Sequence, residues 1–268
     1  MARPTSDATS SGTVARVTLL LQVLAEADGE ASLGDIAERM RLPASTTHRL
    51  LHLLLEQGFV ERGRRSRTYR PGLEFLRVGG LVTSRAEMTD LAGTFMQRVV
   101  DACDETCMLS VHMPRTQTSM IAKVIHGSHP LRYDATLYEP SSLVWGATGQ
   151  GILAFLPDDV VEAVLAREGP SPADGRKMVK PAQVKRDLAI IRQQGYAHTR
   201  SQKIAGAVGI SAPVFNKDGV VAALCITLPE TRFQPAMEKR YSNVLIQNAA
   251  ALSSALGWRG TSPAAQAA

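Results

Sequence analysis

The side chains best suited to binding chemistry gather between residues 39 and 70, where arginine greatly outnumbers acid. Eight arginines lie there (39, 41, 49, 62, 64, 65, 67 and 70), against only Glu56 and Glu61. The run Ala-Ser-Thr-Thr-His-Arg at residues 44–49 adds hydroxyl and imidazole groups. Guanidinium groups bind phosphates and guanine edges, and hydroxyls bind phosphates or base edges. This combination predicts an interface for a polyanion, and for duplex DNA in particular.

Three helices are predicted to position these side chains. Apolar residues recur at helical spacing over residues 14–27, which predicts the first helix. Ser32 followed by Asp35 is a capping-box-like start for the second. Leu42-Pro43 then breaks the chain, and a third helix should end just before Gly58, which suits a left-handed cap.

The third helix divides into two faces on a helical wheel. Its predicted buried face consists of Thr47, Leu50, Leu51 and Leu54. The opposite face presents Ser45, Arg49, His52 and Glu56, with Thr46 and His48 on its flanks. Taken singly, each of these polar residues is more typical of a solvated surface than of a DNA contact. The candidate DNA contacts from this helix are Ser45, Thr46, Thr47, His48, Arg49 and His52.

A basic ribbon follows the third helix and favours the DNA interpretation. Phe59-Val60 and Thr68-Tyr69 are strand-like and flank a turn at residues 63–66. The remaining candidate DNA contacts lie in and around this turn: Arg62, Arg64, Arg65, Arg67 and Arg70. A helix, a break, a polar helix and an arginine ribbon in this order predict a winged helix-turn-helix whose wing contacts the DNA backbone or minor groove.

Composition limits the other possibilities. The 268 residues have room for about two domains. The net charge of +5 is a weak general indication of an anionic partner. Three scattered cysteines (Cys103, Cys107 and Cys225) suit a reducing cytoplasm, and no third ligand completes a zinc site around the first two. Neither a signal peptide nor a long apolar run is present, so a cytoplasmic protein without membrane contact, metal or cofactor is expected.

The second half of the chain alternates strand and helix patterns. Residues 108–111 and 120–124 are strand-like, and residues 149–156, 158–167 and 181–194 are helical. Two apolar strands, 207–215 and 220–228, flank Asn216-Lys217-Asp218-Gly219, a hairpin signal, and residues 235–256 predict a closing helix. One sheet with helices around it is therefore expected.

Residues 13–79, and LPASTTHRLLHLLLEQGFVER most specifically, resemble the winged helix-turn-helix of the IclR family of bacterial transcription regulators. The resemblance continues through HPLRY, GATGQGILAFLP, QQGYA and SAPVFNKDG, and covers nearly all of residues 13–258. It implies an α+β fold with an N-terminal winged helix-turn-helix and a C-terminal GAF-like α/β effector-binding domain. It also implies homodimers, or dimers of dimers, on palindromic double-stranded operator DNA. The expected boundaries are a disordered tail at 1–12, the DNA-binding domain at 13–72, a linker helix at 73–85, the effector domain at 86–258 and a second tail at 259–268.

The resemblance also implies a pocket for a small-molecule effector. By resemblance its lining includes Ala147, Thr148, Gly209, Cys225 and Thr227. Cys225 and Thr227 alternate along one strand, so they share a face. Strand alternation adds four further candidates: Leu109, Val111, Lys123 and Tyr133.

Departures from the family pattern indicate the kind of effector. Val144 and Gln150 stand where many relatives have His and Lys, and the run 206–215 lacks a usual Arg and Cys. A customary acidic run is replaced by the basic segment His198-Thr199-Arg200-Ser201-Gln202-Lys203, which could attract a carboxylate. A site with fewer polar groups favours a larger, partly apolar or aromatic carboxylate over a short keto acid.

Two rival functions and one mechanical hypothesis remain open. His112, His126 and His129 with Cys107 are possible ligands for a metal-dependent or other enzyme in the C-terminal domain, although no nucleophile motif or dinucleotide motif is present. An effector-insensitive DNA binder is the other rival, but the large second domain is unfavourable to it. If an effector controls DNA binding, Gly79-Gly80 is a candidate hinge between the domains.

Overall fold

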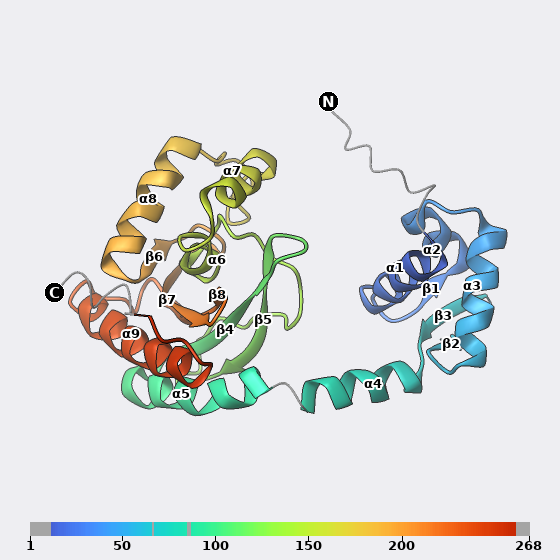
Figure 1. The fold of residues 1–268 in the computed structure, drawn as a ribbon, viewed down its shortest axis with the longest axis horizontal. Helices are drawn as coiled ribbons and strands as arrows, with labels where there is room; N and C mark the ends of the chain where they lie inside the picture. The colour runs from blue at the N-terminus through green and yellow to red at the C-terminus, as the bar shows by residue number, and fades with distance from the viewer. Residues whose placement is uncertain (1–11, 66, 85–86, 261–268) are drawn as a thin grey trace. The chain divides into compact units, whose positions relative to one another are not determined.

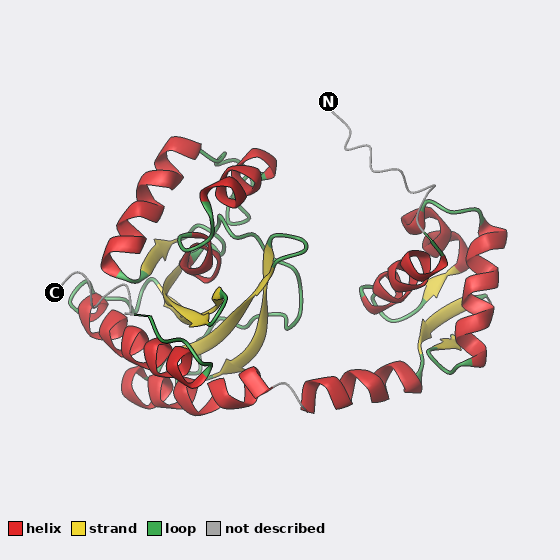
Figure 2. Cartoon of the chain, viewed as in Figure 1, coloured by secondary structure: helices red, strands yellow, loops and turns green. Residues whose placement is uncertain are grey.

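The computed structural model describes residues 12–65, 67–84 and 87–260. The tails expected at 1–12 and 259–268 lie almost entirely outside the described residues, as does Ser66 of the predicted wing turn. The chain divides after residue 86 into two compact units, each with its own core. Helices and strands are mixed in both units, as Figure 2 shows, and the predicted α+β fold is confirmed.

The N-terminal unit follows the predicted order of three helices and a ribbon (Figure 1). Its elements are α1 (Thr13–Ala25), β1 (Ala31–Ser32), α2 (Leu33–Met40), α3 (Ala44–Glu56), β2 (Val60–Arg62), β3 (Thr68–Pro71) and α4 (Leu73–Ser84). The strands form one antiparallel sheet in the order β1-β3-β2. Helical periodicity builds the core, because the apolar faces of α1, α2 and α3 meet around Leu24, Ile36 and Leu51.

Local signals start and stop α2 as predicted. The Ser32 side chain accepts a hydrogen bond from the Asp35 backbone N–H, and the Asp35 carboxylate accepts one from the Ser32 N–H, which completes a capping box. The helix ends at Met40, two residues before Leu42, because Arg41 adopts a left-handed conformation with φ of 52°. This turn separates α2 from α3.

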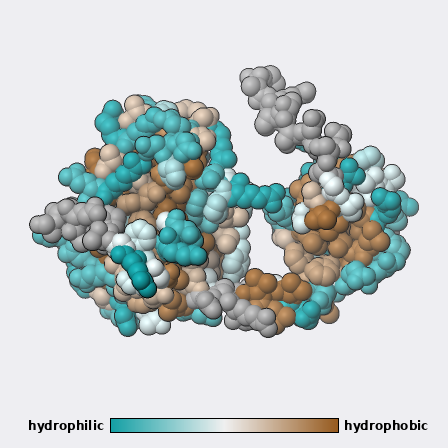
Figure 3. All heavy atoms as spheres, in the orientation of Figure 1, coloured by the Kyte–Doolittle hydropathy of each residue, from teal (hydrophilic) through white to brown (hydrophobic). Residues whose placement is uncertain are grey.

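Helix α4 continues through Gly79 and Gly80 without interruption. Added Cβ atoms at these two glycines would meet nothing within 4 Å. One side of the helix is apolar and open to solvent, with Leu73 and Leu76 exposed by 72% and 71%. In Figure 3 the surface over α4 is correspondingly hydrophobic.

The C-terminal unit is built on one antiparallel sheet in the order β5-β4-β8-β7-β6. The strands are β4 (Thr106–Met113), β5 (Thr118–Ile125), β6 (Ala197–Arg200), β7 (Ala207–Asn216) and β8 (Gly219–Pro229). Helices α5 (Glu87–Cys103) and α9 (Met237–Ala255) cover one face. Helices α6 (Ala147–Leu153), α7 (Asp158–Arg167) and α8 (Pro181–Gln194) belong to the core on the other face.

Side-chain alternation assigns each strand residue to one of these two faces. Leu109, Leu224 and Ile226 pack in the core shared with α5 and α9. Met108 and Cys225 pack in the core shared with α6. Met108 pairs with Cys225, and Leu109 pairs with Leu224. Because residues opposite each other in an antiparallel ladder point to the same side, the two members of each pair lie in the same core.

Candidate functional site

The outward face of α3 carries the polar residues that its helical periodicity predicts there. Ser45, His48, Arg49 and His52 are exposed, and Thr46 is partly exposed. His52 Nδ1 lies 3.3 Å from the Glu56 carboxylate, one helical turn further along. The opposite face is buried at Leu50, Leu51 and Leu54. The helix therefore presents a continuous polar surface over its first two turns.

Thr47 is the exception among the candidate DNA contacts of α3. Its side chain is completely buried, and its hydroxyl donates to the Pro43 carbonyl at 3.2 Å. The prediction of Thr47 as a DNA contact is wrong, because the wheel position that makes it a core residue also removes its hydroxyl from solvent.

The wing is organised by an acidic residue that the sequence pattern does not reveal. The Glu30 carboxylate accepts hydrogen bonds from the Arg64 backbone N–H at 2.7 Å and the Thr68 hydroxyl at 2.8 Å. It also accepts a longer bond from the Arg65 backbone N–H at 3.4 Å. The Arg64 bond, followed by the Thr68 bond, lowers the pKa of Glu30. Glu30 therefore fixes the turn between β2 and β3, although 34 residues separate it from Arg64.

The arginines of this unit divide into paired and unpaired groups. Arg39 pairs with Glu26 at 2.8 Å, and Arg70 pairs with Glu61 at 3.0 Å. Within residues 12–65 and 67–84, the other wing arginines and that of α3 have no carboxylate within 4.0 Å and are exposed: Arg49, Arg62, Arg64, Arg65 and Arg67. Unpaired surface cations beside an exposed polar helix form a surface complementary to the DNA backbone.

The C-terminal unit contains a cavity of about 450 Å³ on the α6 side of the sheet. Five residues that the resemblance assigned to an effector pocket line it: Ala147, Thr148, Gly209, Cys225 and Thr227. The loop between β5 and α6 contributes further lining at residues 134–136 and 139–142. The volume lies within the range of small-molecule binding sites.

One row of paired residues explains the shape of the cavity. Thr199, Gly209 and Thr227 lie opposite one another on β6, β7 and β8, so they share the α6 face. A Cβ on Gly209 would lie 3.0 Å from the Ala147 Cβ, so glycine lets α6 approach the sheet. The Ala147 N–H donates to the Thr199 hydroxyl at 2.9 Å, and its carbonyl accepts from Ser211 at 2.6 Å. These contacts fix the first residue of α6 against the sheet.

A lysine from the basic segment enters the same cavity. Lys203 lines it, and its Nζ lies 3.5 Å from the Thr148 hydroxyl. Gln202 anchors the preceding backbone: its side-chain oxygen accepts from the Gln150 amide at 2.9 Å, and its carbonyl accepts from the Ser171 hydroxyl at 2.7 Å. Gly146, with φ of 85°, leaves room for the Lys203 stem, which would lie 3.0 Å from a Cβ at that position. The sequence marks the segment as basic but does not single out Lys203.

Three of the candidates chosen by strand alternation do not line the cavity, and their placement is corrected. Leu109 and Val111 pack against the core shared with α5 and α9. Lys123 pairs with Leu109 across the strands, and its ammonium donates to the Thr89 carbonyl of α5. The alternation holds but its phase differs by one residue, so Met108 occupies the position expected for Leu109.

Tyr133 is also absent from the cavity lining, although it is close in the chain to residues that form it. Its hydroxyl donates to the Ala205 carbonyl at 3.2 Å. The side chain therefore links the loop after β5 to the loop that contains Lys203. Its candidate role as a ligand contact is replaced by a structural contact between two lining segments.

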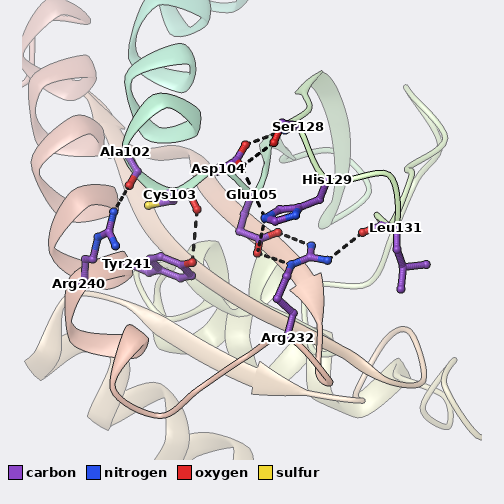
Figure 4. A network of polar contacts seen from close by, with 10 residues as sticks. All are labelled: Ala102, Cys103, Asp104, Glu105, Ser128, His129, Leu131, Arg232, Arg240 and Tyr241. Atoms are coloured by element: carbon purple, nitrogen blue, oxygen red, sulfur yellow. Dashed lines mark hydrogen bonds and ion pairs between the residues drawn. The ribbon is translucent and has the colours of Figure 1, made fainter.

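A polar network fixes the start of the loop that lines the cavity (Figure 4). Arg232 donates to both oxygens of the buried Glu105 carboxylate at 2.7 and 2.6 Å, and also to the Leu131 carbonyl at 3.0 Å. Asp104 accepts from the Ser128 hydroxyl and N–H, both at 2.7 Å, and these bonds lower the pKa of Asp104. The loop after β5 is thereby attached to the start of β4 and to the segment before α9.

The histidines and cysteines of the rival metal site do not come together. Within residues 12–65, 67–84 and 87–260, no three His, Cys, Asp or Glu side chains are arranged to hold a metal ion. His126 Nδ1 instead lies 3.2 Å from the Thr106 hydroxyl, and burial raises the pKa of the Cys107 thiol. The same ranges contain no helix long and apolar enough to cross a bilayer.

Comparison with known proteins identifies relatives for both units. Residues 13–64 match the IclR helix-turn-helix domain, and residues 80–254 match the family described as bacterial transcriptional regulator IclR C-terminal. The chain is 25% identical over 239 residues to the transcriptional repressor IclR of Escherichia coli K12, covering 89% of this chain and 87% of that protein. It is 28% identical over 203 residues to the HTH-type transcriptional regulator KipR of Bacillus subtilis, covering 75% and 80%.

Solved structures share the fold over almost the whole chain. A regulator from Silicibacter sp. TM1040 covers 94% of this chain and 99% of its own, with a TM-score of 0.83 and 23% identity. An IclR homologue from Microbacterium hydrocarbonoxydans, complexed with 4-hydroxybenzoate, covers 91% and 99%, with a TM-score of 0.75 and 23% identity. The matched relatives are named as transcription regulators, so the enzyme alternative is set aside. With both of its units matched, the chain belongs to the IclR family of bacterial DNA-binding transcription regulators.

Proposed function

We propose that this regulator binds operator DNA with an affinity controlled by a small molecule in the α6-side cavity. The effector is a carboxylate with a partly apolar or aromatic body. The observation that carries this proposal is the cavity itself, which combines apolar lining from Met108, Ile121 and Ile204 with a lysine ammonium. A three-carbon keto acid would leave much of its 450 Å³ unfilled.

The Microbacterium homologue provides a first probe for the effector class. That protein was crystallised with 4-hydroxybenzoate, an aromatic monocarboxylate, and has the same fold. At 23% identity the likeness concerns the fold alone, so the effector class for this chain rests on its own cavity residues. Ala147, Thr148, Gly209, Cys225 and Thr227 remain the proposed contacts, and Lys203 joins them.

On the DNA side, α3 is proposed to enter the major groove. Ser45, Thr46 and Arg49 would contact bases or phosphates, with His48 and His52 beside them. The wing arginines Arg62, Arg64, Arg65 and Arg67 would contact the sugar–phosphate backbone or the minor groove, with Arg70 more weakly because it already pairs with Glu61. A bacterial regulator that binds operator DNA is expected in the cytoplasm, because the DNA lies there.

A second copy of the chain is the proposed partner protein. The apolar side of α4, with Leu73 and Leu76 exposed, is the surface expected at its interface. A two-fold homodimer would present two α3 helices to the two halves of a palindromic operator, and dimers of dimers would bind longer or paired sites. Sedimentation velocity measures which assembly forms.

The control of DNA affinity is tested by a gel-shift titration on duplexes that tile the DNA flanking the gene. 4-Hydroxybenzoate should change the apparent Kd for the bound duplex, since an effector must bind the DNA-competent and DNA-incompetent arrangements unequally. Pyruvate serves as the short keto acid. A response to pyruvate with none to any aromatic carboxylate would refute the proposed effector class.

The corrected position of Thr47 leads to a first prediction. Thr47→Val should leave operator affinity unchanged, because the side chain lies in the core and the Pro43 carbonyl keeps its bond from the Thr47 backbone N–H. Its unfolding free energy should change by no more than about 1 kcal/mol. Thr46→Val is the matched variant and should weaken binding, as measured by fluorescence anisotropy. Weaker binding by Thr47→Val in a folded protein would restore Thr47 as a contact.

Glu30 permits a prediction in which two physical effects oppose each other. Removing its negative charge should strengthen DNA binding if Coulomb attraction dominates. Because the carboxylate orders the wing through Arg64 and Thr68, we expect Glu30→Ala to weaken binding several-fold instead. Glu38→Ala removes an equal charge from the exposed surface of α2 and controls for the Coulomb effect. Tighter binding by both variants would show that wing order contributes little.

A further inference from the structure

Among the residues that the structure describes, Lys203 is the one lysine or arginine that lines the cavity, and its surroundings differ from those of the basic residues nearby. His198 pairs with Glu238 at 3.1 Å. Arg200 pairs with Glu230 at 3.6 Å and lies over the Phe233 ring at 4.8 Å. Among the described residues, Lys203 makes no ion pair within 4.0 Å, and its ammonium has a long hydrogen bond to Thr148. His198 and Arg200 thus have acidic partners within the described chain, whereas Lys203 has none there.

The unpaired ammonium is partly buried, which carries a cost. Burial lowers the pKa of Lys203, whereas the Glu139 carboxylate favours its charged form. Glu139 is therefore near enough to influence the ammonium without forming an ion pair with it. A buried cation is stabilised by a hydrogen-bonded anion, and an anionic ligand can provide one.

Hydroxyl groups that line the cavity can complete the binding of an anion. Thr148 is buried and lies next to the ammonium. Thr227 is also buried, and its hydroxyl lies near two sulfur atoms, at 3.7 Å from Cys225 and 3.9 Å from Met108. Sulfur is a weak hydrogen-bond partner. These hydroxyls therefore have bonding capacity available for carboxylate oxygens.

Two acidic side chains also line the cavity without pairing with Lys203. Asp134 and Glu139 are both exposed and both belong to the loop between β5 and α6. Asp134 is only 3.8 Å from the His126 Nε2, so its charge is partly balanced when that histidine is protonated. A ligand with a second carboxylate would meet these acids, and like charges in proximity are unfavourable.

We infer that Lys203 makes the cavity selective for monocarboxylates, with the ligand carboxylate against the ammonium and an uncharged body among the apolar lining residues. Asp134 and Glu139 select against dicarboxylates. This inference rests on the proposed effector site and assigns its charge selectivity to particular residues.

Isothermal titration calorimetry on the full-length protein tests the inference with three related probes. These are 4-hydroxybenzoate, the neutral 4-hydroxybenzamide and the dicarboxylate terephthalate. The wild-type protein should bind 4-hydroxybenzoate about tenfold or more tightly than the amide, since hydrogen bonds to charged groups are the stronger ones. Terephthalate should bind more weakly than 4-hydroxybenzoate.

Variants assign the selectivity to residues. Lys203→Met should remove the preference for carboxylate over amide, while Lys217→Met, in the exposed β7–β8 turn, should retain it. Glu139→Gln should improve terephthalate binding relative to 4-hydroxybenzoate. The affinities of the wild-type protein for 4-hydroxybenzoate and 4-hydroxybenzamide are measured without any variant. They therefore test the inference even if Lys203→Met does not fold.

The outcomes separate the inference from the proposed function. Equal binding of acid and amide by the wild-type protein would overturn the role of Lys203 but leave an aromatic effector in place. Binding of neither probe would overturn the aromatic carboxylate effector, and the charge selectivity with it. Unchanged selectivity in a folded Lys203→Met variant would also overturn the inference.

Discussion

Arg232→Met should destabilise the C-terminal unit by about 3 kcal/mol or more, because it leaves a buried carboxylate without its cation. The Glu105 side chain is 2% exposed and receives two hydrogen bonds from Arg232. Without the guanidinium, nothing offsets the free-energy cost of burying the Glu105 carboxylate away from water. The loop that lines the cavity should also loosen, because Arg232 holds the Leu131 carbonyl.

Tryptophan fluorescence during denaturant unfolding measures this effect selectively. The chain has two tryptophans, Trp145 and Trp258, and both lie in the C-terminal unit. Lys185→Met breaks an exposed ion pair with Glu162 in the same unit and should change stability by about 1 kcal/mol or less. The double variant Glu105→Leu/Arg232→Met should recover much of the stability, since no buried charge remains. If Arg232→Met were as mild as Lys185→Met, the network would not contribute as described.

Arg49→Ala should reduce affinity for the specific operator by about 1–3 kcal/mol, with a smaller effect on unrelated DNA. Arg49 is exposed on α3 without an ion pair among the described residues, so its guanidinium is free for a base or phosphate. Its removal should leave the fold unchanged, because the helix is held by Leu50, Leu51 and Leu54 on the other side.

Arg65→Ala should have a different signature. A wing arginine bound to a phosphate contributes similarly on every sequence, so the variant should weaken binding to specific and unrelated DNA alike. The slope of log affinity against log salt should become shallower by about 0.9 for each phosphate that is no longer neutralised. Anisotropy titrations of both variants on both duplexes, at several salt concentrations, measure the difference. Equal reductions on all sequences from both variants would contradict the separate functions assigned to helix and wing.

The elements with local signals were predictable from the sequence. Helices α7 and α8 have the predicted bounds, because Pro157 and Pro181 mark their starts and the left-handed Gly195 ends the second. The capping box of α2 and the hairpin between β7 and β8 likewise depend on neighbouring residues. In each case the residues that determine the element lie within or beside it.

Elements that depend on distant partners could not be predicted in the same way. Strand β1 has only two residues and exists through pairing with Thr68 and Tyr69. Strand β6 pairs with β7 from residue 197 onward, whereas the sequence of this segment shows only its basic charge. The face predicted for Leu109 is wrong because one strand's alternation does not reveal the register with its neighbour.

The candidate sites show the same division. The polar face of α3 follows from helical periodicity within a single element. Glu30 is separated from the wing it supports by more than 30 residues, and only the folded unit brings them together. Among the basic residues at 198–203, the sequence could not distinguish Lys203, which lines the cavity, from Arg200, which lies over Phe233. Charge was readable from the sequence, but the direction of each side chain was not.

The most direct test of DNA binding by α3 and the wing is a salt titration of the purified protein with duplexes that tile the DNA flanking its gene, measured by fluorescence anisotropy. We predict that one duplex binds more tightly than the rest, and that its affinity falls steeply as salt rises, by about 0.9 in the log–log slope per neutralised phosphate. Binding that is absent from every duplex, or insensitive to salt, would contradict the assignment of α3 and the wing to DNA.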